Sequence, residues 1–149
     1  MTTVQELNQT IQTALDSGKI GTPVCLRASV QLNKGGPEPI VVLAACTRMA
    51  EALFEVQPAK LTARQTPDAS QLNLIVEFAA GQTLSLSIGR GAVNDPDTNL
   101  LLIGNHGIIR LEGGDTLEQQ SWTADASEIE RWRILLAGSL ERNGPVAII

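Results

Sequence analysis

The sequence has few of the residues on which nucleic-acid binding depends. It contains no tyrosine, two phenylalanines, two tryptophans and a single histidine, His106. Its 11 basic residues are outnumbered by 16 acidic ones, which gives a net charge of −5. Non-specific affinity for nucleic acids comes mainly from lysine and arginine, and single-stranded bases stack on aromatic rings. The composition therefore argues against a nucleic-acid partner.

Cysteine and histidine are also too scarce for a recognisable metal site. Cys25 and Cys46 are the only cysteines, and neither Cys-x-x-Cys nor His-x-x-x-His occurs. A zinc site needs three or four convergent ligands. In a cytosolic chain, two isolated cysteines are more often small buried hydrophobes than a disulfide. We expect no metal and no disulfide.

No segment reads as a signal peptide or a membrane span. Residues 1–6 have neither a basic start nor an apolar run, and the longest apolar stretch runs only from Ile40 to Cys46. Spanning a bilayer takes roughly 20 apolar residues. We therefore predict a cytoplasmic protein with no membrane partner. A chain of 149 residues with 43% hydrophobic residues also fits one globular domain, residues 1–149.

Hydrophobic periodicity predicts three helices and a set of strands. Apolar residues recur at helical spacing over 4–17, 40–55 and 125–140, and Thr3 with Glu6, like Asp125 with Glu128, forms a capping box. Alternating or short apolar runs predict strands at 23–32, 60–65, 71–79, 83–88, 100–103, 108–111 and 116–122. Grouped hairpins predict an α+β fold, a largely antiparallel open-faced sheet of about six strands with helices on one face.

Three passages resemble parts of one known family. The Ser-Gly-x-Ile-Gly passage at 17–21, with the long strand after it, resembles the opening of the C-terminal domain of the Gfo/Idh/MocA oxidoreductases. The segment 99–111 resembles that family's Ile-Gly-x-x-Gly-x-x-x-Leu hairpin, and 78–82 resembles its turn between two strands. The resemblance implies a sheet domain that, in complete members, follows a Rossmann domain, shapes the substrate pocket and often pairs sheet to sheet.

The chain lacks the nucleotide-binding parts of that family. A dinucleotide fold needs Gly-x-Gly-x-x-Gly after its first strand. The nearest approach, Gly89-Arg90-Gly91, has Asn94 in place of the third glycine. The family's Glu-Lys-Pro motif is absent as well, because none of Lys19, Lys34 and Lys60 precedes a proline. We expect no Rossmann domain and no cofactor bound by this chain.

The proton-transfer groups implied by the resemblance are replaced. Family members carry an Asp and then a His-x-x-Asp on the helix that follows a glycine-containing loop. Aligned on the Gly35-Gly36 loop and Leu53, those positions hold Val41, Ala45 and Arg48. Valine and alanine cannot exchange a proton, and arginine stays protonated at physiological pH. Since no His or Asp lies between the loop and Leu53, we expect no catalytic residues.

Other candidates for catalysis fit structural roles better. His106 lies between two glycines, which favours an exposed turn residue. Ser29 and Ser87 lie on predicted strands without the Gly-x-Ser-x-Gly elbow of a serine nucleophile. Three aspartates stand beside proline or glycine in predicted loops, where Asp serves turn hydrogen bonding: Asp95, Asp97 and Asp115.

The outward positions of the predicted strands allow two interpretations. They are either solvated or part of a flat, partly wet sheet-to-sheet contact, and the family resemblance favours the contact. These positions are Arg27, Ser29, Gln31, Asn73, Ile75, Glu77, Ser85 and Ser87.

Three hypotheses for function follow. The leading one is a non-catalytic, stand-alone counterpart of the Gfo/Idh/MocA C-terminal domain that forms a homo-oligomer, a dimer, through its sheet. The second is one half of a split or truncated NAD(P)-dependent oxidoreductase whose Rossmann half is a separate protein partner. The third is a regulatory module that binds a ligand or partner, for which the sequence holds no specific feature.

Overall fold

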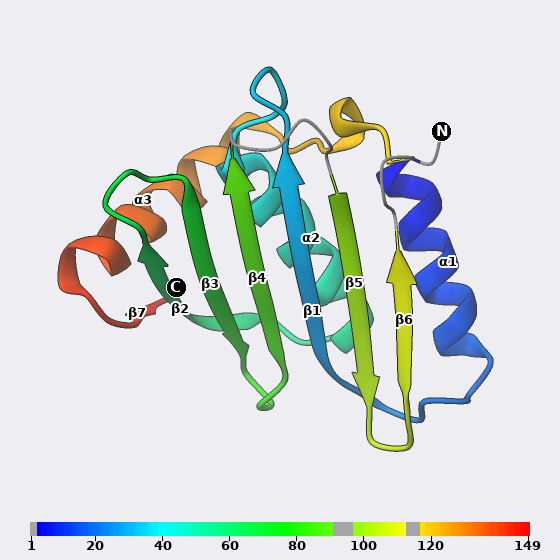
Figure 1. Ribbon diagram of the computed structural model, residues 1–149. Coiled ribbons are helices and arrows are strands. Elements are labelled where there is room, and N and C mark those ends of the chain that lie inside the picture. The colour runs from blue at the N-terminus through cyan, green and yellow to red at the C-terminus, as the bar shows by residue number, and fades with distance from the viewer. Residues whose placement is uncertain (1–2, 91–96, 113–116) are drawn as a thin grey trace.

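The computed structural model describes residues 3–90, 97–112 and 117–149. These residues form three α-helices and one sheet of seven strands (Figure 1). In chain order the elements are α1 (Val4–Asp16), β1 (Pro23–Leu32), α2 (Pro39–Phe54), β2 (Pro58–Gln65), β3 (Gln71–Phe78), β4 (Thr83–Arg90), β5 (Asp97–Gly104), β6 (Ile108–Glu112), the 3₁₀ turn η2 (Gln119–Ser121), α3 (Ala126–Arg142) and β7 (Val146–Ala147).

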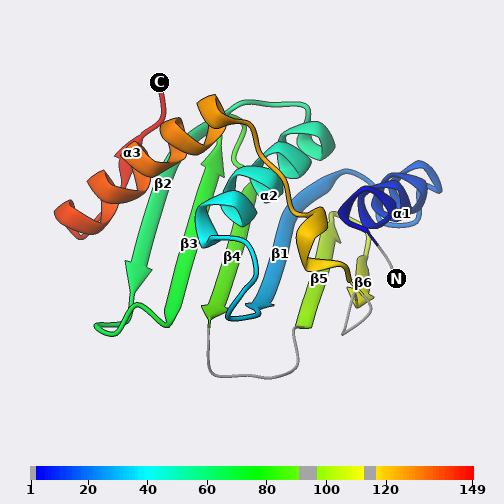
Figure 2. The same cartoon turned by 90° about the horizontal axis from the view of Figure 1, so that it is seen from above.

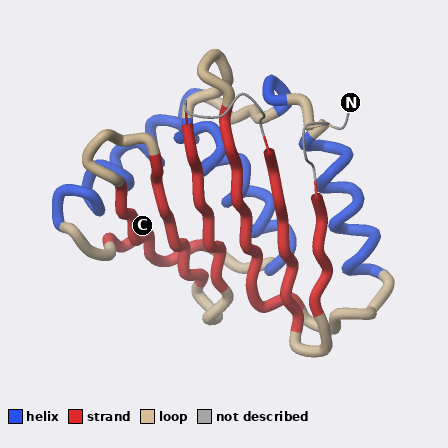
Figure 3. Tube along the Cα trace, viewed as in Figure 1, coloured by secondary structure: helices blue, strands red, loops and turns tan. Residues whose placement is uncertain are grey.

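The strands form one mixed sheet in the order β6-β5-β1-β4-β3-β2-β7 (Figure 3). The pair β1 and β4 is parallel, and the other described pairs are antiparallel. The chain reaches this order by leaving β1 through α2, building the β2–β3 hairpin, and returning to lay β4 beside β1. The predicted α+β class and largely antiparallel sheet are confirmed.

The three helices cover one face of the sheet and leave the other open (Figure 2). Inward side chains alternate along each central strand, so that Leu26, Ala28 and Val30 of β1 are buried. Above them, α2 is buried on nearly all sides, and its small residues Ala44 and Ala45 allow close packing. The core therefore lies between the sheet and the helices. The outward strand positions lie on the opposite face of the sheet, which the helices do not cover.

Local capping confirms two predicted helix starts. The hydroxyl of Thr3 accepts a hydrogen bond from the Glu6 N–H at 3.2 Å at the start of α1. At the start of α3 the Asp125 carboxylate accepts from the Glu128 N–H at 2.8 Å, and the Glu128 carboxylate accepts from the Asp125 N–H at 3.1 Å. The reciprocal pair at Asp125 and Glu128 is the predicted capping box, whereas at α1 the described bond is the one from the Glu6 N–H to Thr3 alone. These bonds satisfy N–H groups that have no partner within the helix.

The prediction of a strand at 116–122 is wrong. Residues 117–122 hold a single bridge residue, Leu117, and then the η2 turn. Leu117, Gln119 and Trp122 are buried, so their side chains cover the core without forming a strand ladder. Conversely, the two-residue strand β7 was not predicted, because Val146 and Ala147 are too few to show alternation. It pairs with β2 and brings the sheet to seven strands, not about six.

Two further differences concern the ends of strands. The strands predicted at 83–88 and 100–103 are longer in the structure, because β4 continues to Arg90 and β5 runs from Asp97 to Gly104. Asn94, Asp95 and Asp115 lie outside the described residues. Within the described part of the chain, no helix is both long enough and apolar enough to cross a bilayer.

Candidate functional site

Two of the passages that carry the family resemblance meet in space. The N–H of Asn105 donates to the Thr22 carbonyl at 3.0 Å, and the Thr22 N–H donates to the Asn105 side-chain oxygen at 2.9 Å. The N–H of His106 donates to the Ile20 carbonyl at 2.9 Å. A Cβ at Gly104 would overlap that same carbonyl oxygen, so the close approach requires glycine. The motif residues thus dock the segment after α1 onto the β5–β6 hairpin.

His106 is an exposed turn residue, as predicted. Its backbone N–H makes the docking contact described above. The hairpin turn that carries it follows β5 at one end of the sheet. Nothing in its setting supports a role as a general base.

The three α2 positions aligned with proton-transfer groups hold no such groups. Val41 and Ala45 are apolar, and Ala45 is buried. Arg48 Nη1 lies 2.6 Å from Glu128 Oε1, and Arg48 Nη2 donates to the Thr123 carbonyl at 2.9 Å. Since Glu128 also caps α3, this arginine ties the middle of α2 to the start of α3. Its role is structural.

Ala45 and Arg48 also line a groove of about 220 Å³ between α1 and α2. Arg48 is the one charged side chain among the described residues that line it. The Ser121 hydroxyl in the groove accepts from the Val4 N–H at 2.9 Å and donates to the Glu118 carbonyl at 2.5 Å. The groove therefore offers neither a general base nor an activated nucleophile.

The two cysteines are free and have different surroundings. Cys46 is completely buried on α2, and desolvation raises the pKa of its thiol to about 12. It is the small buried hydrophobe that the sequence predicts. Cys25 is only half-buried on β1, so the same prediction is wrong for it. Across the described ranges, no three His, Cys, Asp or Glu residues converge as metal ligands would.

The open face of the sheet brings all the predicted outward residues together. Register pairs Arg27 with Ser85, and Ser85 in turn with Ile75. Since directly paired residues point to the same side of a sheet, these three share the open face. The same register argument places the rest of the set on that face: Ser29, Gln31, Asn73, Glu77 and Ser87.

Hydrogen bonds fix part of this face. Gln71 Nε2 donates to the Ser87 hydroxyl at 2.6 Å and to the Asn73 side-chain oxygen at 3.2 Å. The Ser87 hydroxyl donates to the same Asn73 oxygen at 3.0 Å. Short side chains held by neighbouring strands give a flat and ordered polar surface across β3 and β4.

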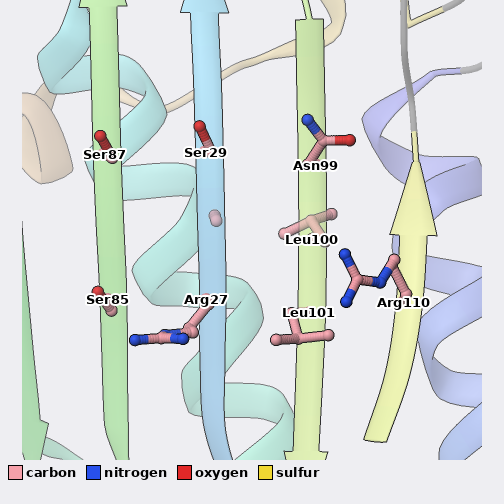
Figure 4. Close-up of a pocket in the computed structure, with 9 residues that line it drawn as sticks. Arg27, Ser29, Ser85, Ser87, Asn99, Leu100, Leu101 and Arg110 are labelled. Carbon is pink, nitrogen blue, oxygen red and sulfur yellow. The ribbon is translucent and has the colours of Figure 1, made fainter.

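A depression of about 280 Å³ lies near the centre of the open face, between two arginines (Figure 4). Arg27 extends from β1 toward β4 and Ser85, and Arg110 extends from β6 toward β5 (Figure 4). Neither guanidinium forms an ion pair with a described residue. The remaining lining residues are Ala28, Ser29, Ser85, Ser87, Asn99, Leu100 and Leu101.

Sequence reasoning missed the β5 and β6 side of this depression. Asn99 and Leu101 alternate with buried residues, and Arg110 lies between the partly buried Ile109 and Leu111, a signal that was present in the sequence. What the pattern does not give is that β5 lies beside β1, which brings Leu101 next to Arg27.

Comparison with known proteins shows the fold. No family model and no curated protein sequence matches the chain. Among solved structures, apo scyllo-inositol dehydrogenase from Lactobacillus casei superimposes with a TM-score of 0.72 at 13% identity, over 95% of this chain and 60% of that one. A putative myo-inositol dehydrogenase from Sinorhizobium meliloti gives 0.71 at 14% identity, over 95% and 62%. The myo-inositol 2-dehydrogenase from Lactobacillus plantarum gives 0.68 at 12% identity, over 95% and 61%.

These dehydrogenases belong to the Gfo/Idh/MocA family, so the fold implied by the sequence resemblance is confirmed. The chain spans about 60% of the length of the dehydrogenases it matches. That share agrees with a match to one domain of a larger enzyme, the C-terminal one.

Proposed function

We propose that this chain is a non-catalytic domain of the Gfo/Idh/MocA C-terminal fold that forms a dimer through its open sheet face. The observation that carries the proposal is the size of that face. Six strands at about 4.8 Å spacing and about eight residues at 3.3 Å rise give a surface of roughly 29 by 26 Å, or about 750 Å². Each partner in a standard protein interface buries about 800 Å².

The composition of the face supports the same conclusion. Most of its predicted contact residues are small or uncharged, and the centre of a protein interface is depleted of charged residues. Exposed apolar side chains add to it: Ile75 is 46% exposed and Ile108 is 62% exposed. Ile108 pairs with Ile103 of β5, and Ile103 pairs with Cys25 of β1. Since Cys25 is two residues from Arg27 and points to the open face, Ile108 lies on this face too.

Self-association is tested by placing a large charge at the centre of the face. Ser85→Arg puts a guanidinium between the two sheets, whereas Ala137→Arg adds the same group on the exposed side of α3 and serves as the matched control. By light scattering, the wild type and Ala137→Arg should have the mass of a dimer, and Ser85→Arg that of a monomer. A dimer that survives Ser85→Arg would show that the face is not the interface.

The absence of catalysis by this chain alone is supported by the residues of α2. Val41 and Ala45 cannot take part in proton transfer, and the guanidinium of Arg48 is held by Glu128 and Thr123. Titration of the purified chain with NAD and with NADP, followed calorimetrically, should give no saturable binding in the micromolar range. Saturable binding of either nucleotide by this chain alone would refute the proposal.

A second candidate rests on the partial coverage of the dehydrogenases. A unit that spans about 60% of such enzymes would work as one half of an oxidoreductase if a separate polypeptide supplied the Rossmann domain. Purification of the tagged chain from its host would then yield a stoichiometric subunit that carries Gly-x-Gly-x-x-Gly. The complex, unlike the chain alone, would bind NAD or NADP. Recovery of the chain without such a subunit favours the first proposal.

A further inference from the structure

We infer that a pocket between α2 and α3 binds a small zwitterion, an α-amino acid of about the size of alanine. The pocket lies on the helix-covered side of the sheet, opposite the open face (Figure 2). Binding there goes beyond the proposed function and does not depend on the dimer. It would give the chain a specific ligand site.

Helical spacing brings the lining residues of the pocket together. On each helix they recur at intervals of three and four residues, so each helix presents one stripe to the pocket. Pro58, the first residue of β2, completes the lining. The α2 stripe is Ala44, Thr47, Arg48 and Glu51, and the α3 stripe is Glu128, Arg131 and Trp132. Together these residues border a cavity of about 170 Å³.

The hydroxyl of Thr47 lacks a partner that an occupant of the pocket can supply. Thr47 is 3% exposed, and its buried hydroxyl oxygen has no hydrogen-bond partner among the described residues. A threonine within a helix can bond the carbonyl four residues back, but this hydroxyl makes no such bond. A buried polar group without a partner costs stability, so native structures rarely leave one. Because Thr47 lines the pocket, a bound ligand can complete the missing bond.

The pocket also holds one unpaired charge of each sign. Arg48 and Glu128 satisfy each other, since Arg48 Nη1 lies 2.6 Å from Glu128 Oε1. Glu51 and Arg131 form no ion pair with a described residue. The Arg131 guanidinium lies instead over the Trp132 ring, 5.6 Å from its centre, in a cation–π contact. The pocket is therefore bordered by an unpaired carboxylate from α2 and an unpaired guanidinium from α3.

These groups fit a molecule with one positive and one negative end. An ammonium group donates to the Glu51 carboxylate and to the Thr47 hydroxyl, which lie one turn apart on the same stripe of α2. A carboxylate accepts charge-assisted hydrogen bonds from Arg131. An ion of a single sign leaves either Glu51 or Arg131 without a partner. A zwitterion pairs both and adds no net charge to the pocket.

The volume of the pocket limits the ligand to a few atoms. Liquid water takes up about 30 Å³ per molecule, so the cavity of about 170 Å³ holds about six water-sized groups. The smallest α-amino acids, glycine and alanine, have about that many non-hydrogen atoms. A ligand of this size binds with a dissociation constant of about 0.1–1 mM when its polar groups are well matched.

Ordered water is the alternative occupant of the pocket. Water molecules can bond the Thr47 hydroxyl and hydrate the two charged side chains. Filling the cavity with water immobilises several molecules, whereas one zwitterion fills it and pairs both charges at once. The amino acid is therefore the better ligand.

Calorimetric titration of the full chain with L-alanine tests the site. Saturable binding with a dissociation constant of about 0.1–1 mM is expected. Acetate and ethylammonium each carry one half of the charge pattern, and each should bind at least ten-fold more weakly than alanine. Acetate that binds as tightly as alanine would assign the pocket to a simple anion and overturn the inference.

Variants of the lining residues locate the site. Glu51→Gln and Arg131→Gln should each weaken alanine binding at least ten-fold, and Thr47→Val should do the same. Without ligand, Thr47→Val should raise the melting temperature, because it removes a buried hydroxyl that has no partner. A lower melting temperature would show that the hydroxyl is already satisfied. The matched controls Glu130→Gln and Arg133→Gln lie on α3 outside the pocket and should leave binding unchanged.

The outcomes separate this site from the proposed dimer. Ser85→Arg, on the other side of the sheet, should bind alanine as the wild type does. Absence of saturable alanine binding refutes the site, leaves the pocket to water and does not affect the dimer. Binding that persists unchanged in both Glu51→Gln and Arg131→Gln also refutes it. A wild type that is monomeric but binds alanine through these residues refutes the dimer and keeps the site.

Discussion

Replacing Ser139 with alanine should destabilise the protein by about 2–3 kcal/mol. Ser139 lies on α3 and is completely buried. Its hydroxyl accepts from the Ala63 N–H of β2 at 2.8 Å and donates to the Gly144 carbonyl at 2.6 Å. A buried N–H left without a partner costs about 1–3 kcal/mol, and the half-buried carbonyl adds less, because water reaches it in part. At about 2–4 °C per kcal/mol, the melting temperature should fall by about 5–10 °C.

Urea unfolding followed by tryptophan fluorescence measures this loss. The matched control is Thr13→Ala on α1, whose exposed hydroxyl donates only to the Gln9 carbonyl at 3.0 Å. This control should change the free energy of unfolding by less than about 0.5 kcal/mol. Both variants are compared with the wild type at one protein concentration, because dimerisation adds concentration-dependent stability. A loss below about 0.5 kcal/mol in Ser139→Ala would refute the view that this hydroxyl anchors α3 to β2.

Three further predictions concern titratable and charged groups. A thiol reagent applied to a native monomer, such as the Ser85→Arg variant, should label Cys25. It should label Cys46 only after unfolding, because Cys46 is completely buried and the pKa of its thiol is raised to about 12. Labelling of both thiols in the native state would contradict this prediction. Hydrogen bonds from hydroxyls and backbone in the β2–β3 turn lower the pKa of Asp68 from 3.8 to about 2. The stabilisation that these bonds give the folded protein is therefore present above about pH 4 and is lost as the pH falls toward 2. A carboxyl titration by NMR with a midpoint near 3.8 would contradict this prediction. Arg48→Ala should cost about 1 kcal/mol in urea unfolding, since its ion pair with Glu128 is half exposed, and should leave the dimer mass unchanged; a change in that mass would place Arg48 in the interface.

The parts of the fold that the sequence predicts are those set by near neighbours. Strict alternation from Leu72 to Phe78 follows from one buried and one open face, and the structure confirms it. Helix starts were equally local, because Thr3 and Asp125 cap groups only three residues away. The same alternation was enough to place all the predicted outward residues on one face.

The rest depends on contacts between distant segments. Arg48 binds Glu128, 80 positions away, and no local pattern marks that pair. The insertion of β1 between β4 and β5 creates the depression, and it follows from the return of the chain after the β2–β3 hairpin. Leu117 and Trp122 read as part of a strand because apolar side chains can cover a core from a loop as well as from a ladder.

The mass of the wild-type chain in solution tests the central claim most directly. A single chain has a mass of 15.9 kDa. Sedimentation equilibrium over a range of protein concentrations should approach twice that mass as the concentration rises. A mass that stays at 15.9 kDa throughout the range would contradict assembly through the open sheet face.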